Sequence, residues 1–205
     1  MTPLLMGGAQ VVMPNYLLFW ESKKFKIFIY LISMKKWTEF EIASTLAMDF
    51  FNKENLVVVD NCGWSGHEAD ILVVTRDLRL IDVEIKISRA DLKADAQKNK
   101  WKHYGVWSKA PMLPNGHVSH PHKIWKHYYA LPEEIWKPEL LECLPSVKSG
   151  VVLLRRDILK NGKTFVRYTV VRRAVPFRDS LKLSTADVLN VARLASLRMW
   201  THRTR

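Results

Sequence analysis

The sequence predicts an α/β protein with a mixed central sheet. Its core is one helix, three strands, a second helix and a fourth strand, followed by a C-terminal β-hairpin and a last helix. Three observations predict this order: two β-branched runs on either side of a short turn, a polar helix before the next strand, and an Asn-Gly pair between two further strand patterns. A helix between consecutive strands allows a parallel crossover, so both parallel and antiparallel pairs are expected.

The first helix is expected over residues 38–51. At 100° per residue its apolar side chains form one stripe, made of Ile42, Ala43, Leu46, Ala47 and Phe50. Thr38 is placed to cap the N-terminus, and Glu41 is the matching third residue of a capping box. Glu39 falls inside the stripe and is expected to point inward, whereas Glu41 falls on the opposite, exposed face.

Three strands and a second helix are expected next. The strands are NLVVVDN (55–61), ADILVVT (69–75) and LRLIDVEIKIS (78–88), with a tight connection at Arg76–Arg79. Residues 90–105 indicate a polar helix that ends at Gly105. The Pro-rich stretch 106–122 is expected to be a loop, and residues 123–131 a strand.

The C-terminal part is expected to add a hairpin and a helix. Pro132 opens a short helix that runs toward Leu144. The strand patterns at 151–159 and 164–175 flank Asn161-Gly162, the strongest short signal for a hairpin turn. The last helix begins after Ser184.

Composition and charge narrow the function classes. The chain has 205 residues, of which 48% are apolar and 25% charged, as in one globular domain. Its net charge is +12, which favours a polyanionic partner, nucleic acid first and an anionic membrane surface second. Residues 149–205 hold 13 Lys or Arg and three Asp or Glu, so the basic surplus lies in this segment.

No membrane-spanning segment is expected, because charged residues interrupt the apolar stretch 16–33. Two distant cysteines favour a reducing, cytoplasmic setting. Residues 1–33 admit two interpretations: extra strands packed on the domain, or an extension upstream of a natural start at Met34. The expected domain is then 34–205, with its core at 38–131.

The candidate catalytic residues are Asp70, Glu84 and Lys86. Glu84 and Lys86 are two apart on a strand and therefore share a face. Depending on the loop length, residue 70 lies opposite residue 85 or opposite Glu84. Two carboxylates close together suit a hard cation such as Mg²⁺ or Mn²⁺, and a nearby lysine can offset charge on a phosphate in the transition state.

A surface salt-bridge ladder is the alternative interpretation of this strand, and Asp82 would extend it. The strand context weighs against the ladder, because Val83, Ile85 and Ile87 alternate with the charged residues. A carboxylate also begins the neighbouring strand, and Glu39 is expected to approach from the helix before it.

The pattern Glu39, Asp70 and Glu84-Ile-Lys86 resembles the PD-(D/E)XK nuclease superfamily, whose restriction-endonuclease-like core is αβββαβ. The segment EIKISRADLKADAQKNKWKHY also resembles phage and bacterial members associated with DNA repair. The resemblance covers about half of the chain. It implies that Asp70 and Glu84 bind the metal, that Lys86 is the catalytic lysine, and that Glu39 is the acid of the first helix. Ala69 stands where many members have proline.

Further basic residues are candidates for contacts with DNA phosphates. They are Lys100 on the second helix, which shares a face with Gln97 and Tyr104, and Lys160, Lys163 and Arg167 around the hairpin turn. Tyr168 is expected to pack inward with Val166 and Val170.

A zinc site made of His117, His120, His122 and His127 is disfavoured, because no cysteine accompanies them and their spacing is poor. The sequence thus predicts a Mg²⁺- or Mn²⁺-dependent deoxyribonuclease. The alternative is a nucleic-acid-binding module with the same fold and little or no catalysis.

Overall fold

The computed structural model describes residues 36–51, 54–98, 101, 123–159, 161 and 163–203. The chain divides into two compact units, 1–36 and 37–205, and the fold below is that of the second unit. The interpretations of residues 1–33 and of the loop 106–122 fall outside the described residues.

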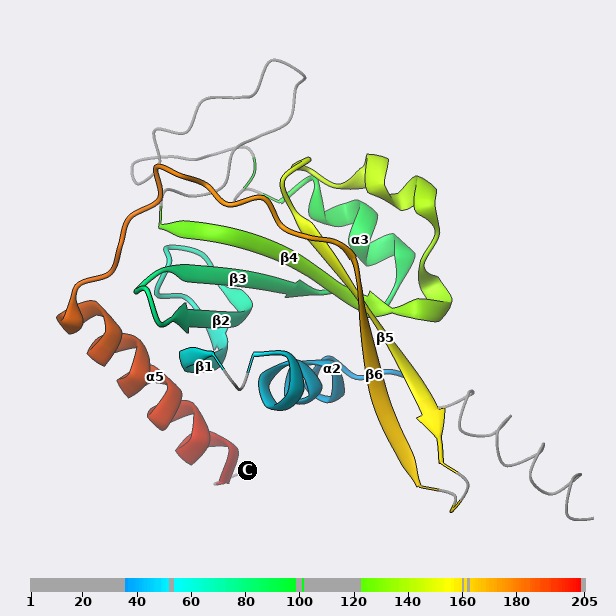
Figure 1. Cartoon of the computed structure of the whole chain (residues 1–205), viewed down its shortest axis with the longest axis horizontal. Helices are drawn as coiled ribbons and strands as arrows, with labels where there is room; N and C mark the ends of the chain where they lie inside the picture. Colours follow the sequence, from blue (N-terminus) through cyan, green and yellow to red (C-terminus); the bar gives the residue numbers. More distant parts are fainter. Residues whose placement is uncertain are drawn as a thin grey trace, which may run out of the picture. The chain divides into compact units, whose positions relative to one another are not determined.

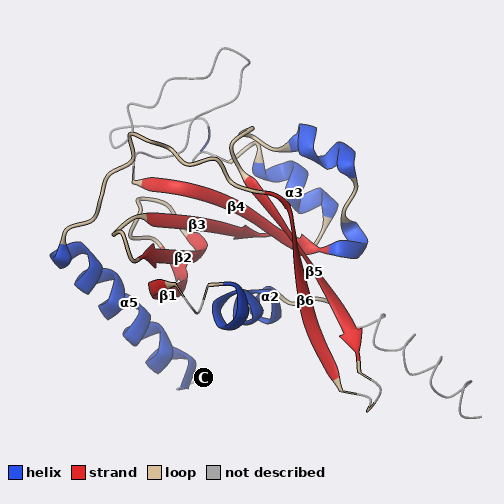
Figure 2. Ribbon diagram, in the orientation of Figure 1, coloured by secondary structure: helices blue, strands red, loops and turns tan. Residues whose placement is uncertain are grey.

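The protein is an α/β protein built on a six-stranded mixed sheet with the order β1-β2-β3-β4-β5-β6 (Figures 1 and 2). The strands are β1 (Asn55–Cys62), β2 (Ala69–Thr75), β3 (Leu80–Ile85), β4 (Ile124–Pro132), β5 (Gly150–Ile158) and β6 (Thr164–Arg172). The β3-β4 and β4-β5 pairs are parallel and the other pairs are antiparallel. The mixed sheet and the C-terminal hairpin predicted from the sequence are confirmed.

One face of the sheet carries the first helix. Helix α2 (Glu39–Thr45) continues into a π-helical turn, η1 (Leu46–Phe50). The Thr38 side chain accepts a hydrogen bond from the Glu41 N–H at 3.1 Å, so the predicted cap is present. Ile42 and Leu46 are fully buried in a core that includes Val73 and Val83.

The other face carries two groups of helices. Helix α5 (Thr185–Arg203) packs on β1, where Val191 lies in a core with Val59 and Leu72. Helix α3 (Arg89–Asp95) and the 3₁₀ turn η3 (Pro138–Cys143) cover β4 and β5 through a third apolar cluster. A capping box between Ser184 and Asp187 begins α5, as predicted.

Two predicted helices are shorter than expected. Helix α3 ends at Asp95, because the N–H groups of Gln97 and Lys98 form 3₁₀-type hydrogen bonds to the carbonyls of residues 94 and 95. Trp101 is again helical, and residues 99–100 and 102–105 of the expected helix lie outside the described residues. The helix expected after Pro132 is two short 3₁₀ turns, η2 (Glu133–Ile135) and η3, separated by Trp136 and Lys137.

The β5–β6 hairpin reaches beyond the other strands (Figure 1). Val166 and Val170 pack against the core of the α2 face, as expected. The Tyr168 ring lies on the same side and packs edge-on against Phe50 at a centroid distance of 5.1 Å, although it remains 38% exposed. No helix in the part of the chain that the structure describes is long and apolar enough to cross a membrane.

Candidate functional site

Strand β3 and the residue that follows it carry a row of charged side chains that the fold buries. Asp82, Glu84 and Lys86 are 1%, 2% and 2% exposed, while Val83 and Ile85 face the α2 core. The surface-ladder interpretation is therefore wrong, because a surface ladder requires solvent on its charged face. Buried charges persist only when they are paired and hydrogen-bonded. The partners of each charged side chain therefore determine which chemistry this face of the sheet can support.

The register between β2 and β3 brings Asp70 next to Glu84. Ile71 pairs with Val83, and one step further along the antiparallel ladder Asp70 lies opposite Glu84. Of the two registers expected, this is the one that puts both carboxylates on the same face. The Ile85 N–H donates to Asp70 Oδ2 at 2.6 Å and fixes the carboxylate at the end of the strand.

Burial and the neighbouring Glu84 charge raise the pKa of Asp70 to about 6, although the Ile85 N–H and the Lys86 ammonium act in the opposite direction. Two carboxylates held together in a low dielectric repel each other. A cation bound between them would remove that repulsion.

Glu39 is exposed at the first residue of α2, so its predicted inward orientation is wrong. Ile42 is the first buried position of the helix, and the start of the helix, which holds Glu39, is exposed. Its charge still contributes to the raised pKa of Asp70, as the weakest of the five causes. Glu39 thus acts on the site through its charge, from outside the buried row.

Glu41 has a partner, against expectation. Its carboxylate accepts two hydrogen bonds from Arg156, at 2.8 Å from Nε and 2.6 Å from Nη2. The Arg156 side chain is only 6% exposed, and its guanidinium lies 3.8 Å from the centre of the Trp37 ring. Glu41 and Arg156 are 115 residues apart, so no local sequence pattern predicts this pair.

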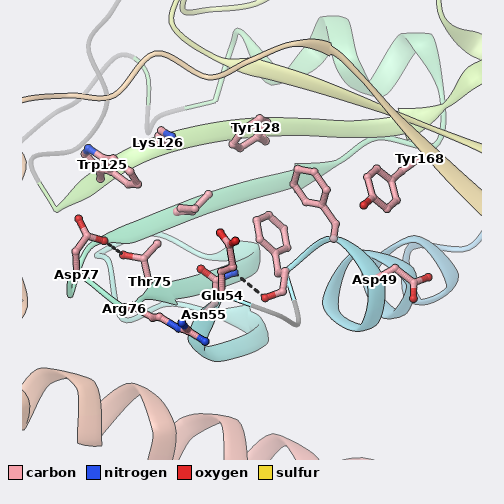
Figure 3. A pocket seen from close by; sticks show the side chains of 13 residues that line it. Asp49, Glu54, Asn55, Thr75, Arg76, Asp77, Trp125, Lys126, Tyr128 and Tyr168 are labelled. Carbon is pink, nitrogen blue, oxygen red and sulfur yellow. Dashed lines mark hydrogen bonds between the residues drawn. The ribbon is translucent and has the colours of Figure 1, made fainter.

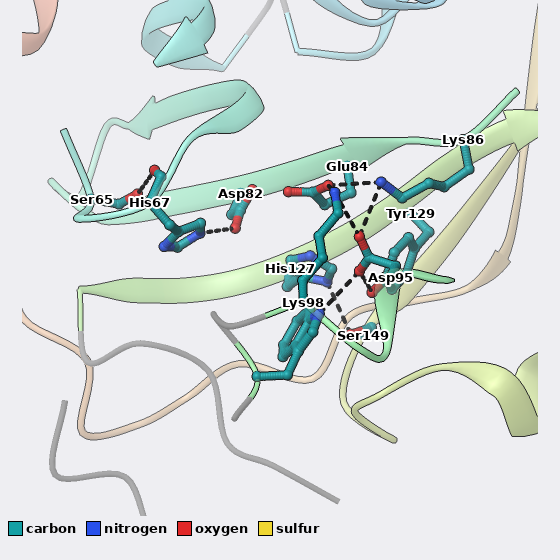
Figure 4. A network of polar contacts seen from close by, with 11 residues as sticks. Ser65, His67, Asp82, Glu84, Lys86, Asp95, Lys98, His127, Tyr129 and Ser149 are labelled. Carbon is teal, nitrogen blue, oxygen red and sulfur yellow. Dashed lines mark hydrogen bonds and ion pairs between the residues drawn. The ribbon is translucent and has the colours of Figure 1, made fainter. Parts of the chain in front are cut away.

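Lys86 lies between two carboxylates (Figure 4). Its Nζ is 2.9 Å from Glu84 Oε2 and 3.1 Å from Asp95 Oδ1. The Lys86 N–H also donates to the Ala130 carbonyl of β4, which anchors the backbone at the end of β3. Burial lowers the pKa of Lys86, but the charges of Glu84 and Asp95 outweigh it and raise the pKa above its ordinary value, so the lysine is charged.

Two residues of this network, Asp95 and Lys98, were not predicted. Asp95 is fully buried, and Lys98 Nζ lies 3.0 Å from Asp95 Oδ1 and 3.5 Å from Glu84 Oε2. The sequence holds one signal for Asp95: it follows the buried Leu92 by three residues and therefore shares its helix face. An acid on the buried face of a short helix needs a counter-charge, and Lys86 and Lys98 supply it.

A second part of the network lies further along β3. His67 Nε2 is 2.8 Å from Asp82 Oδ2, and Asp82 Oδ1 has no hydrogen-bond partner among the described residues. Asp82 is therefore more than the ladder residue expected from the sequence. His127 on β4 pairs in register with Asp82 on β3 and is fully buried. Its Nδ1 lies 3.0 Å from Ser149 Oγ. His117, His120 and His122 lie outside the described residues.

The donor set fits a cation of the Mg²⁺ type. Within the described ranges, no group of three or more His, Cys, Asp or Glu side chains is placed to hold a metal. Mg²⁺ does not need such a cage, because it keeps several waters and is usually bound by one or two carboxylates together with substrate phosphates. Asp70 and Glu84 supply two carboxylates, whereas a structural zinc site requires four ligands.

The basic residues of the hairpin are partly engaged within the chain. Arg167 Nε is 3.0 Å from Asp157 Oδ2, and Arg155 Nε is 2.9 Å from Asp157 Oδ1. Both arginine side chains are more than half exposed. Lys163 is exposed beside the turn, whereas Lys100 and Lys160 lie outside the described residues.

A groove of about 710 Å³ lies on the α2 face and is lined by Phe50, Phe51, Trp125, Tyr128 and Tyr168 among others (Figure 3). The register of β3 and β4 shifts between Leu80 and Ile81, so both Trp125 and Lys126 line this groove. The charged row of β3 faces the other side of the sheet. The groove is therefore separate from the site built on Asp70 and Glu84.

Comparisons with known proteins assign no family to this α/β protein with its charged site on a central strand. No family model matches the sequence, and no curated protein matches it. Among solved structures, the chain is similar to SPO1766, a protein of unknown function from Silicibacter pomeroyi. The two share 20% identity over 71% of this chain and 75% of the other, with a TM-score of 0.39. That score is too low to carry the fold of one protein to the other.

Proposed function

We propose that the protein is a metal-dependent nuclease that hydrolyses phosphodiester bonds of DNA. The observation that carries the proposal is the convergence of Asp70, Glu84 and the charged Lys86 at one end of the buried row. The element order helix, three strands, helix, strand supports a restriction-endonuclease-like core, since it matches the core of the PD-(D/E)XK nucleases that the sequence resembles.

Each residue has a role that follows from its environment. Asp70 and Glu84 would hold a Mg²⁺ or Mn²⁺ ion, because they are adjacent, partly or fully buried carboxylates with repulsion to relieve. Such an ion supplies a polarised phosphate oxygen and a water of lowered pKa. The Lys86 ammonium, held beside Glu84, stabilises negative charge on the phosphate as it develops.

Exposed Glu39 adds negative charge at the edge of the site, which strengthens the attraction for a divalent ion. The net charge of +12 favours DNA as the substrate, since an excess of Lys and Arg attracts the phosphate backbone. The proposed role is DNA processing in the cytoplasm, in repair, recombination or the handling of phage DNA.

One observation favours a second function, a DNA-binding module without catalysis. Glu84 Oε2 contacts both Lys86 and Lys98, so a metal must compete with two ammonium groups for this oxygen. If the metal does not displace the ammonium groups from Glu84, the charged network only stabilises the fold. The protein then binds DNA through its basic surface without cutting it.

The test is cleavage by purified protein of supercoiled, linear, single-stranded and four-way-junction DNA, with Mg²⁺ or Mn²⁺ and with a chelator as the blank. Asp70→Asn and Glu84→Gln keep the side-chain shape and remove the charge that holds the ion. We expect each to lower the cleavage rate by at least about a thousandfold. Asp49→Asn makes the same charge change on the exposed surface of η1 and is expected to leave the rate unchanged.

Two results would reject the proposal. One is cleavage that survives Asp70→Asn in protein purified free of host nucleases. The other is wild-type protein that binds DNA but cuts none of the four substrates with either metal, which would favour the binding module.

A further inference from the structure

Asp95 is one of four charged side chains that form a closed ring on the buried face of β3. The ring runs from Glu84 Oε2 to Lys86 Nζ (2.9 Å), to Asp95 Oδ1 (3.1 Å), to Lys98 Nζ (3.0 Å) and back to Glu84 Oε2 (3.5 Å). Positive and negative groups alternate around it, so each ammonium touches both carboxylates (Figure 4). The ring joins the end of β3 to helix α3.

The second oxygen of Asp95 is fixed from the opposite side. Asp95 Oδ2 accepts hydrogen bonds from the Tyr129 hydroxyl at 2.5 Å and from Trp101 Nε1 at 3.0 Å. Tyr129 is fully buried, and burial together with the Asp95 charge raises its pKa well above the ordinary value, so its hydroxyl stays a donor at neutral pH. Asp95 therefore has one oxygen for the lysines and one for its own anchors.

The members of the ring differ in their access to solvent. Glu84, Lys86 and Asp95 are buried, whereas the Lys98 side chain is 47% exposed. Lys98 can leave the ring at little cost, because a half-exposed ion pair is screened by water. Lys86 cannot leave in the same way, because moving a buried ammonium away from both carboxylates would leave buried charges uncompensated.

We infer that Asp95 is a positioning residue of the proposed nuclease site, which holds the Lys86 ammonium in place when Glu84 turns to a divalent cation. This inference rests on the proposed function. Without the Asp95 charge, Lys86 would have Glu84 as its main buried counter-charge. The ammonium would then compete with the metal for the same carboxylate. With Asp95 in place, the ammonium has a second anchor 3.1 Å away and stays beside the site when Glu84 turns to the ion.

Asp95→Asn tests this, because the amide keeps the shape and can still accept hydrogen bonds from Tyr129 and Trp101. We expect the Mg²⁺ concentration for half-maximal cleavage to rise at least tenfold and kcat to fall at least tenfold. KM for DNA should change less than twofold, since Asp95 is buried and does not touch the substrate. Asp91→Asn, on the first turn of the same helix, makes the same charge change and should alter none of these values.

A second readout does not depend on cleavage. Pulse labelling with an amine-reactive ester, followed by mass spectrometry, measures the reactivity of Lys86 relative to the exposed Lys93 on α3. Mn²⁺ binding in the absence of DNA is measured by electron paramagnetic resonance. In Asp95→Asn we expect Mn²⁺ to bind at least tenfold more weakly and Lys86 to label faster, at a temperature well below both melting midpoints.

Tyr129→Phe tests the role of Asp95 if Asp95→Asn does not fold. It removes one hydrogen-bond donor to Asp95 and leaves every charge in place. We expect a two- to tenfold rise in the Mg²⁺ requirement with KM unchanged. Wild-type cleavage with an unchanged metal requirement in the folded variants would overturn the inference and leave the proposed function standing. Wild-type protein that cuts no DNA would overturn the proposed function instead, while Mn²⁺ binding and labelling still report on Asp95.

Discussion

The arginines of the β5–β6 hairpin and the lysines around Glu84 both form ion pairs, but in different surroundings. Arg155 and Arg167 share Asp157 on an exposed surface, where water and salt weaken the attraction. Lys86 shares Glu84 and Asp95 in a site from which solvent is nearly absent. The hairpin arginines can therefore exchange a carboxylate for a phosphate, whereas Lys86 is held at one position. The first arrangement suits binding, and the second suits chemistry that depends on distance.

The largest expected effect is on the buried side of this comparison. Lys86→Met removes the ammonium and leaves Glu84 and Asp95 facing each other with only Lys98 between them. We expect it to lower the free energy of unfolding by about 3–5 kcal/mol, the cost of an uncompensated buried charge. Urea denaturation measures this loss. Lys93→Met, at an exposed position of α3, is the matched control and should cost less than about 0.5 kcal/mol. A loss below 1 kcal/mol for Lys86→Met would mean that the ring does not hold in solution.

The next effect concerns Asp70 and pH. Its pKa of about 6 in the folded protein lies above the ordinary value of 3.8, so the folded state binds the proton more tightly than the unfolded state does. The contribution of Asp70 to stability is therefore present at low pH and is lost as the pH rises from about 4 to about 6. Asp70→Asn should raise the unfolding free energy by about 1–3 kcal/mol at pH 7 and leave it nearly unchanged below pH 4.

Melting curves of the two proteins across pH 3.5–8 check the sign. Mg²⁺ at pH 7 should raise the melting midpoint of the wild type and not of Asp70→Asn, because the ion replaces the missing proton. A variant that is less stable than the wild type at pH 7 would contradict the predicted repulsion between Asp70 and Glu84.

The pair of Glu41 and Arg156 lies between the two regions in exposure. Glu41→Gln keeps one hydrogen bond to Arg156 and loses the charge, and we expect a cost of about 1–2 kcal/mol in unfolding free energy. Cleavage should be unaffected, because the pair does not touch the charged row of β3. Thermal or urea denaturation measures the cost, and a double-mutant cycle with Arg156→Met isolates the pair term. A change within 0.3 kcal/mol would show that Glu41 is solvated, as its local pattern suggested.

The sequence predicts those features of the site that depend on local spacing. The period of two puts Glu84 and Lys86 on the same side, although β3 itself ends at Ile85. Thr38 and Ser184 begin their helices as the capping patterns indicate. The β5–β6 hairpin and the order of elements follow in the same way, whereas β3 and β6 are shorter than the expected strands 78–88 and 164–175. These features need only neighbours along the chain or across one ladder.

What covers that face does not follow from spacing. Glu84 is paired with Lys98, which follows α3, Asp82 is paired with His67 from the loop before β2, and the partner of Glu41 lies 115 residues away. Asp95 was not singled out because the predicted helix ran to Gly105, and a longer helix gives no reason to choose one acid on it. The hydrophobic stripe likewise assigned Glu39 to the core, although the first turn of α2 is exposed. Tertiary packing overrides the pattern at each of these positions.

The smallest expected effect is on the exposed side of the comparison, at the hairpin. Lys163→Ala and Arg167→Ala should each flatten the slope of log K against log salt by about 0.9 on duplex DNA, the value for one phosphate contact. Binding should weaken equally for unrelated sequences, because phosphates carry no base information. Fluorescence anisotropy with the cleavage-deficient Asp70→Asn protein measures the slope. Asp157→Asn should tighten binding, since it releases Arg155 and Arg167 from their shared carboxylate. Arg193→Ala, an exposed position on α5, is the matched control and should leave the slope unchanged. If the hairpin variants behave like Arg193→Ala, the hairpin is merely solvated and the DNA lies on another basic surface.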